Sequence, residues 1–265
     1  MSWDWVVTYP NDVIGVAKGN FMNLATSVGI YASIPKGMNG TLLFPGSEKF
    51  YTYFDCFTYS RLHASFNLWA AREPKCINQA FNVVNGDTES WQKMWPKLAR
   101  RFGCKIPANQ FEIDIGKDAG STMPLAEKPP IAGIAAEMGL EGRFGQGKVE
   151  QRIDLIKWSQ RDDVKKAWGK LASSHRLEKD ALEKVTRGCL GFLLGQDYNL
   201  VKSMSKARKL GWTGYLCINP LLLISWALDY AFAKLMAIVA TSTHGDSLSE
   251  CLDELEQAKV LPKTK

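Results

Sequence analysis

A lone apolar strand near the start of the chain constrains the fold more than any other feature of the sequence. Residues 3–9 are mostly β-branched and aromatic, which is typical of a strand, and Pro10-Asn-Asp12 breaks it. Such a strand needs neighbours on both sides, yet no other strand precedes it. We therefore expect a sheet whose partner strands are missing, and we interpret the chain as truncated at its N-terminus.

The rest of the chain is predicted to be mostly helical, with a few short strands. Short strands are expected over residues 42–44 and 80–84, where apolar runs are bounded by turns. Gly103 should end the helix that starts after residue 88, and Asp87 or Thr88 should cap its first turn. Apolar spacing predicts helices over residues 20–33, 58–72, 91–102, 131–138, 150–160, 162–173 and 177–192, with a last helix at 248–255.

Composition excludes several classes of protein. The 265 residues are 46% hydrophobic and 23% charged, as in an ordinary globular protein, and the net charge of +6 is spread over several segments. The two densest basic stretches, 93–105 and 202–209, are interpreted as solvated helix faces, so no nucleic-acid partner is expected. The six cysteines contain no CxxC pair, which predicts free thiols and no metal site. With no signal peptide visible, we expect a cytoplasmic protein.

An uncharged stretch near the C-terminal end is the oddest piece of the sequence. Residues 210–228 carry no charge, and the apolar character continues to residue 240. This length could span a bilayer. However, Pro220 interrupts the run early, and Asp229 and Lys234 would each be costly inside a membrane, so a membrane span is not the favoured interpretation.

Several segments carry a family resemblance when their order and spacing are taken together. They are Trp5-Val-Val-Thr-Tyr-Pro-Asn-Asp-Val-Ile-Gly15, Phe21-Met-Asn-Leu24, Ile30-Tyr-Ala32, Phe44-Pro-Gly46, Leu62-His-Ala64, Leu68-Trp-Ala-Ala71, Asn78-Gln-Ala-Phe-Asn-Val-Val-Asn-Gly-Asp87, Trp91 and Trp95-Pro-Lys-Leu-Ala-Arg-Arg-Phe-Gly103. As a set they resemble the progesterone 5β-reductase/iridoid synthase-like enzymes, an atypical branch of the extended short-chain dehydrogenases, and most of all its fungal members.

The resemblance implies an α/β fold of Rossmann type. On this basis the chain is expected to be the C-terminal part of such an enzyme, with a mostly helical substrate domain and the dinucleotide-binding half missing. Residues 1–20 would be the residual end of the Rossmann sheet, 21–215 the substrate-binding region, 216–245 an anomalous apolar insert, and 246–265 a C-terminal helix and tail.

The resemblance also implies site residues. The motif from Tyr9-Pro10 to Gly15 matches the strand end that meets the nicotinamide of NADPH in the family, which makes Tyr9, Pro10 and Val13 the candidate cofactor contacts. The family's substrate pocket is walled by a helix that here opens with Phe21, Met22 and Asn23. Trp212 is a further substrate-binding candidate. From the residues alone, Pro10 could merely end a strand and Phe21 could be ordinary core.

The departures from the family pattern concern catalysis. A dinucleotide fold needs a glycine-rich turn, and no G-x-G-x-x-G occurs: Gly142-Arg-Phe-Gly-Gln-Gly147 has the wrong order. The catalytic residues are therefore unknown. Two Y-x-x-x-K matches, Tyr198/Lys202 and Tyr230/Lys234, follow every substrate-domain motif and are interpreted as chance. The insert at 217–245 has three open interpretations: a real insert, a membrane segment or a translated intron.

Three functions remain open at this point. The first is NADPH-dependent reduction of an enone or ketone in a small natural product, in fungal secondary-metabolite or toxin biosynthesis, with hydride supplied by the cofactor. The second is a catalytically inactive, truncated module that binds a small molecule. The third is a membrane-anchored remnant that uses the apolar insert. Substrate identity, reaction direction and oligomeric state are beyond the sequence.

Overall fold

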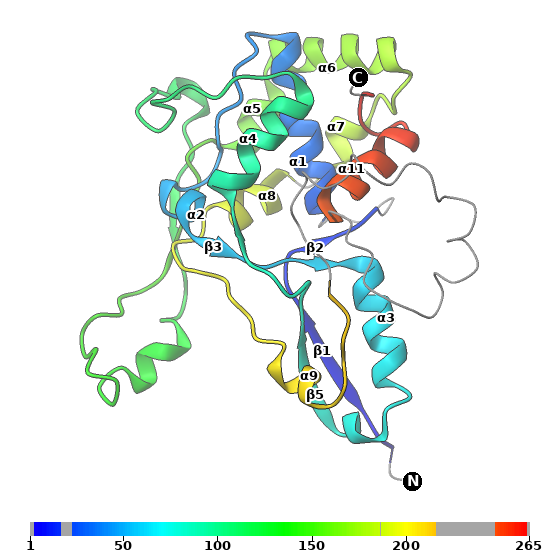
Figure 1. Ribbon diagram of the computed structural model, residues 1–265. Coiled ribbons are helices and arrows are strands. Elements are labelled where there is room, and N and C mark those ends of the chain that lie inside the picture. Colours follow the sequence, from blue (N-terminus) through cyan, green and yellow to red (C-terminus); the bar gives the residue numbers. More distant parts are fainter. Residues whose placement is uncertain (1–2, 17–22, 186, 216–246, 264–265) are drawn as a thin grey trace.

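The computed structural model describes residues 3–16, 23–185, 187–215 and 247–263 (Figure 1). The strands are β1 Val6–Pro10, β2 Val13–Ile14, β3 Phe54–Asp55, β4 Thr58–Tyr59, β5 Gln79–Val83, β6 Glu89–Ser90, β7 Thr122–Pro124 and β8 Lys148–Glu150. The α-helices are α1 Leu24–Ser33, α2 Glu48–Thr52, α3 Ser60–Ala70, α4 Trp91–Phe102, α5 Leu155–Gln160, α6 Asp162–His175, α7 Ala181–Lys184, α8 Arg187–Leu194, α9 Ser205–Lys209 and α11 Ser247–Gln257. Four 3₁₀ turns complete the set: η1 Ile34–Gly37, η2 Pro74–Cys76, η3 Gly116–Asp118 and η4 Pro130–Ile134.

The strands form four separate pairs, two of them parallel. β1 pairs with β5 over five positions, from Val6 opposite Gln79 to Pro10 opposite Val83. β2 pairs with β4 over two positions. Two of the three predicted strands, at 3–9 and 80–84, are thus confirmed as β1 and β5, with bounds displaced by one to three residues. Parallel pairing joined through helices is the mark of an α/β fold, as predicted.

A helical layer lies beyond the carboxyl ends of β1 and β5 and holds the main core (Figure 1). Nearly every residue of α1 is buried, and α4 buries Trp91, Met94, Trp95 and Phe102 on one face. This is the periodic stripe that the sequence predicts for α4. The helix ends at Gly103, which is left-handed with φ 67° and confirms the predicted stop.

The predicted cap of α4 is wrong. Ser90 occupies the N-cap position and makes no side-chain cap hydrogen bond. The reason is tertiary: Glu89 and Ser90 pair with β3 as strand β6, with Phe54 opposite Ser90 and Asp55 opposite Glu89. This pairing holds the chain extended up to residue 90, so the helix begins at Trp91.

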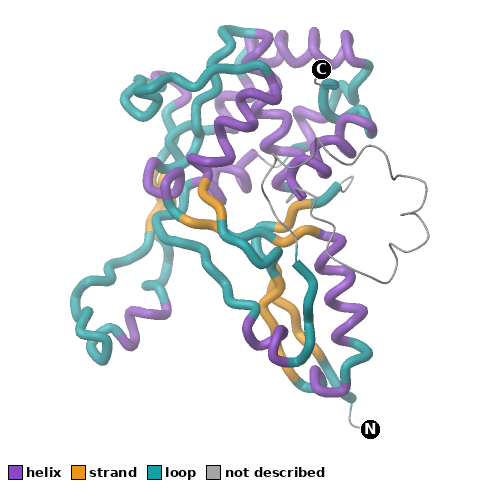
Figure 2. The backbone as a smooth tube through the Cα atoms, viewed as in Figure 1, coloured by secondary structure: helices purple, strands orange, loops and turns teal. Residues whose placement is uncertain are grey.

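Three other predicted elements differ from the structure. Residues 42–44 are not a strand: Leu42 donates to the Lys105 carbonyl at 2.9 Å and the Phe44 N–H donates to Gln110 Oε1 at 3.0 Å, so an irregular segment satisfies this backbone. The predicted helix at 177–192 is divided into α7 and α8. The helix expected at 131–138 is only the 3₁₀ turn η4, on a long loop between β7 and β8 that projects from the body (Figure 2).

A second apolar cluster packs α3 against the β1–β5 pair. Phe66 of α3 meets Phe81 of β5 with ring centroids 5.7 Å apart, and Trp212 lies 5.0 Å from Phe66. The opposite face of β1 is open, since Trp5, Val7 and Tyr9 are 41%, 37% and 52% exposed.

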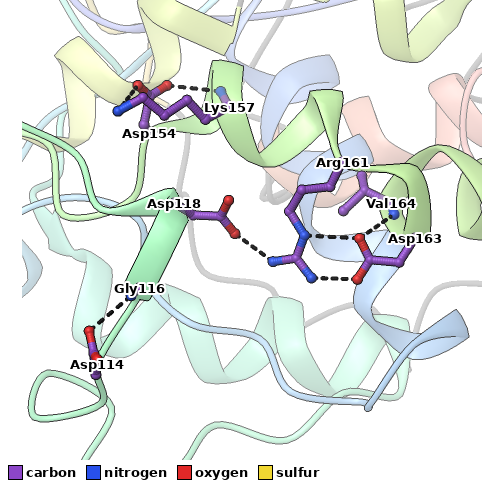
Figure 3. A network of polar contacts seen from close by, with 8 residues as sticks. All are labelled: Asp114, Gly116, Asp118, Asp154, Lys157, Arg161, Asp163 and Val164. Atoms are coloured by element: carbon purple, nitrogen blue, oxygen red, sulfur yellow. Dashed lines mark hydrogen bonds and ion pairs between the residues drawn. The ribbon is translucent and has the colours of Figure 1, made fainter.

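A polar network joins η3 to the start of α6 (Figure 3). The Arg161 guanidinium pairs with the buried Asp118 carboxylate and with Asp163. It lowers the pKa of Asp163 below its usual range. The network ties a loop with little apolar content to the helical layer.

Replacing Arg161 with methionine is expected to lower the free energy of unfolding by about 1–3 kcal/mol, because the buried Asp118 carboxylate would lose its cation. Urea denaturation at pH 7 measures this. Lys184→Met is the matched control: its pair with Asp180 is exposed at both ends, so its loss should change stability much less than Arg161→Met does. Equal effects of the two variants would show that the Arg161 network adds nothing.

Candidate functional site

Residues 10–15, which we call the strand-end turn, run from the last residue of β1 through β2. This segment is tied to both parallel pairs. The Asn11 N–H donates to Thr58 Oγ1 at 2.8 Å, and the Thr58 hydroxyl donates to the Val83 carbonyl at 2.6 Å. The Asn11 amide donates to the Cys56 carbonyl and, at 3.3 Å, to Asp55 Oδ1. The turn therefore has a defined shape at the carboxyl ends of β1 and β5, where open parallel sheets bind their ligands.

Asp12 gives this turn its unusual backbone. Its φ of 33° is positive, a region that residues other than glycine seldom adopt. Such strain persists where surrounding contacts impose it, and it is concentrated at functional sites. Here the imposing contacts are those of Asn11, the residue immediately before it.

Two carboxyl groups meet at the turn. The carboxyls of Asp12 and Asp55 each act on the ionisation of the other, and Asp55 is completely buried, with its Oδ1 accepting from the Cys56 N–H at 2.8 Å. Burial raises the pKa of Asp12 to about 6. Burial, and then the neighbouring Asp12 charge, raise the pKa of Asp55 well above its usual range. Near neutral pH the pair therefore retains a proton.

An irregular segment, residues 195–204, crosses the same strand ends. Lys202 Nζ donates to the Pro10 carbonyl at 2.9 Å. The Leu200 N–H donates to the Phe54 carbonyl at 2.9 Å, and the Asn82 amide donates to the Ser203 carbonyl at 3.3 Å. The segment is thus fastened to β1, β3 and β5, although it has no regular structure of its own.

The structure brings one Y-x-x-x-K match to the strand end. Tyr198 is 41% exposed, and burial together with the charges of Asp12, Asp197 and Asp55 raises the pKa of its phenol. A tyrosine that serves as proton donor beside a lysine has a lowered pKa, so this environment is the opposite of an activated one. The second match, Tyr230/Lys234, lies outside the described residues.

The predicted cofactor contacts lie together on the turn. Pro10 ends β1, while Tyr9 and Val13 are 52% and 40% exposed beside it. Exposed apolar side chains next to the strand end fit the flat face of a nicotinamide ring. The fit covers only this part of a dinucleotide, because the described residues contain no glycine-rich turn between a strand and a helix that could receive the pyrophosphate.

The predicted substrate residues are not all brought together. Phe21 and Met22 lie outside the described residues. Asn23 caps α1: its Oδ1 accepts from Thr26 at 2.9 Å and its amide donates to the Gly15 carbonyl at 3.2 Å, which links the helix to the turn. Trp212 is buried with Phe66 and Trp69 in the cluster under β5. The substrate roles of all four remain predictions.

Sequence reasoning missed Asp12 and Asp55, and it considered Lys202 only as a catalytic residue. Asp12 carried a signal, because it lies inside the Tyr9–Gly15 motif from which the cofactor contacts were predicted. Asp55 carried none, since its neighbour in space is distant in sequence. Tyr198 and Lys202 lie on an irregular segment. Their four-residue spacing therefore does not place the two side chains on one face of a helix.

A shallow groove of about 590 Å³ lies elsewhere, along α4. It is lined mainly by apolar side chains, among them Tyr51, Pro96, Ala99, Ile106 and Phe111, and includes no residue of the strand-end turn.

In the part of the chain that the structure describes, no three His, Cys, Asp or Glu side chains are grouped to hold a metal ion. Within the same described ranges, no helix is long and apolar enough to cross a membrane. The predicted insert at 216–245 falls outside them.

Comparison with known proteins agrees with this architecture. The parallel pairs and the strand-end turn define a Rossmann-type α/β protein, and residues 1–118 match the family model of a PRISE-like Rossmann-fold domain. The chain belongs to the PRISE-like branch of the short-chain dehydrogenase/reductase superfamily. This confirms the family resemblance of the sequence motifs.

Three relatives show the extent of the similarity. An uncharacterized protein of Schizosaccharomyces pombe is 39% identical over 213 residues, 80% of this chain and 52% of the relative. The short chain dehydrogenase gsfE of Penicillium aethiopicum is 26% identical over 218 residues, 81% of this chain and 50% of the relative. The 3-oxo-Delta(4,5)-steroid 5-beta-reductase of Arabidopsis thaliana is 27% identical over 235 residues, 88% and 49% of the two chains. The chain spans about half the length of these relatives.

The family match corrects one expectation. The dinucleotide-binding half was expected to be missing, but the matched Rossmann-fold region begins at residue 1 and includes β1, β2, β4 and β5. The expectation relied on an apparently unpartnered first strand and on the absence of a glycine-rich motif. Parallel strand pairing, which the sequence does not display directly, is the better indicator of this fold.

Proposed function

We propose that this chain forms the nicotinamide-facing part of an NADPH-dependent reductase that acts on an enone or ketone of a small natural product. The observation that carries the proposal is the strand-end turn, which lies at the carboxyl end of the parallel β1–β5 pair, where the parallel β2–β4 pair begins, inside the region matched to a Rossmann-fold domain. Fungal secondary metabolism and a cytoplasmic location are part of the same proposal.

The residues of this chain would orient the cofactor and exclude water. When bound, the nicotinamide supplies the hydride. Tyr9 and Val13 would cover one face of the ring and the backbone after Pro10 would hold its carboxamide side. Asn23 would keep the turn in place through its bond to the Gly15 carbonyl. Phe21, Met22 and Trp212 remain the candidates for the substrate side.

The substrate class is supported by one relative's name. A 3-oxo-Delta(4,5) steroid contains a carbonyl conjugated with a carbon–carbon double bond, and the Arabidopsis relative is named as its reductase. The exposed side chains of Tyr9 and Val13 would offer apolar surface to a flat, largely apolar molecule of that kind next to the ring. Enone reduction therefore fits the exposed Tyr9 and Val13 better than reduction of a charged substrate.

Binding of NADPH, followed by its fluorescence, tests the proposal. Val13→Glu is expected to weaken binding at least tenfold, because it introduces a charge where the ring would stack. Ile77→Glu is the control, since Ile77 is similarly exposed, at 44%, but lies before β5 at the other end of the strand pair. Absence of NADPH binding by the unmodified chain, or equal losses in both variants, would overturn the proposed function.

A second candidate function is a non-catalytic module that binds a small molecule. It is favoured by the lack of a glycine-rich phosphate cradle among the described residues. Calorimetric titration with an enone such as progesterone separates the two: the module should bind the enone without NADPH and leave NADPH unoxidised. The membrane-anchored alternative depends on residues 216–245, which lie outside the described part of the chain.

A further inference from the structure

We propose that Lys202 is the positioning residue of the strand-end turn: its ammonium holds the Pro10 carbonyl and balances the Asp12–Asp55 pair, so that the turn keeps the shape in which it meets the nicotinamide. The inference rests on the proposed function for its cofactor, but the clamp itself is a property of this chain. Lys202 belongs to the Tyr198/Lys202 match, in which the raised pKa of Tyr198 argues against a role in proton transfer. The clamp is a different role for the same lysine.

The first argument is geometric. Lys202 Nζ lies 2.9 Å from the carbonyl oxygen of Pro10, the last residue of β1. The next residues make the turn: Asn11, fixed by Thr58, and Asp12 with its positive φ. A donor on the Pro10 carbonyl therefore acts at the point where the backbone leaves the strand and becomes strained.

The second argument is that the segment carrying Lys202 is anchored independently on each side. Leu200 and Asn199 bond to both backbone groups of Phe54, at 2.9 Å each. Beyond the lysine, the Val84 N–H contacts Met204 Sδ at 3.3 Å. Since the backbone on either side is fixed, the lysine is pre-oriented and loses little freedom when it clamps the turn.

The third argument is electrostatic. Burial raises the pKa of Asp12 and of the Cys56 thiol, and the charge of Lys202 opposes both rises because it favours the ionised forms. Asp12 is also influenced by Asp55, and its own charge acts on Tyr198 and on Cys189. Lys202 is the cation in this otherwise acidic set.

The turn would consequently change with pH in a way that depends on Lys202. Below about pH 6 Asp12 is protonated and the pair needs little compensation. Above that pH the Asp12–Asp55 pair is negatively charged. Among the groups named above, only the Lys202 ammonium offsets that negative charge. Loss of the lysine should therefore matter more at pH 8 than at pH 5.5, and should move the Asp12 titration to higher pH.

The experiment compares the unmodified chain with Lys202→Met and Lys202→Arg. NADPH affinity is measured at pH 5.5 and 8, and the Asp12 carboxyl carbon is titrated by NMR. Lys202→Met is expected to weaken NADPH binding at least tenfold at pH 8 and less at pH 5.5, with an Asp12 titration above pH 6. Lys202→Arg, which retains a donor and a charge, should restore most of both properties.

The outcomes separate this inference from the proposed function. If the unmodified chain binds no NADPH, the proposed function fails, and the Lys202 clamp is then judged by NMR alone. An Asp12 titration that moves upward in Lys202→Met and returns in Lys202→Arg supports the clamp. An Asp12 titration that is the same in all three proteins, or NADPH affinity unchanged by Lys202→Met at pH 8, overturns it.

Discussion

Replacing Gly46 with alanine is expected to destabilise the fold by about 3 kcal/mol or more. A Cβ built at Gly46 would lie 1.9 Å from the Leu194 carbonyl oxygen and 2.4 Å from its carbon. Both are backbone atoms, and the same oxygen accepts the Ser47 N–H at 3.1 Å, so it cannot move away without loss of that bond. Either the 45–47 turn or the end of α8 must shift. Urea denaturation with a tryptophan fluorescence readout measures the change.

A second glycine provides the matched control. Gly169 lies on the exposed side of α6, and a Cβ there would meet no atom within 4 Å. Gly169→Ala is therefore expected to stabilise the protein by about 0.5–1 kcal/mol, since alanine is the better helix former. A Gly46→Ala protein as stable as the unmodified chain would show that residues 45–47 and α8 do not pack as described.

The Gly46 contact illustrates what a motif can and cannot predict. Phe44-Pro-Gly46 was one of the segments that carried the family resemblance, but nothing local says why the glycine is needed. The reason is the close approach of the end of α8, nearly 150 residues later. Phe44 was likewise taken for a strand residue, whereas its ring packs edge-on to Trp95 with centroids 5.1 Å apart. The periodicity of apolar residues describes one segment at a time, so it cannot predict contacts between distant parts of the chain.

Predictions succeeded where a local pattern decides the structure. The stripe of α4 and the left-handed Gly103 that ends it are encoded within a dozen residues. The run of β-branched and aromatic residues up to Pro10 likewise identifies β1. The two-residue strands β2 and β4 could not be found in this way, because each exists only through pairing with the other.

The residues of the candidate site also fall into two groups: those that a local pattern predicts and those that only the fold brings together. Tyr9, Pro10 and Val13 belong to one contiguous motif, so the sequence could nominate them together. Asp55 and Lys202 reach the turn from β3 and from the irregular segment 195–204, and only the fold brings them there. The motif alone does not predict that this site also contains two interacting carboxyls, Asp12 and the completely buried Asp55.

That pair gives the second prediction of large effect, which concerns stability against pH. The folded pKa of Asp12 is about 6 against an ordinary value of 3.8, so between these values the folded chain retains a proton that the unfolded chain has released. The raised pKa of Asp12 therefore stabilises the folded state at low pH. This stabilisation declines as the pH rises from about 4 to 6. Asp55, whose pKa is also raised, extends the decline to higher pH.

Asp12→Asn is expected to remove this decline, because an amide does not ionise and can donate to the Asp55 carboxylate. The rise of the Asp12 pKa from 3.8 to about 6 already includes the opposing charge of Lys202, and it corresponds to about 3 kcal/mol at a pH above both values. We expect the variant to exceed the unmodified chain in unfolding free energy by about 2 kcal/mol at pH 8 and to equal it within about 0.5 kcal/mol at pH 4.5. Glu137→Gln, on the exposed loop between β7 and β8, should show no such difference between the two pH values. An Asp12→Asn protein whose advantage is the same at both pH values would mean that the two carboxyls do not share a proton, and that the strained turn is held by Asn11 and Lys202 alone.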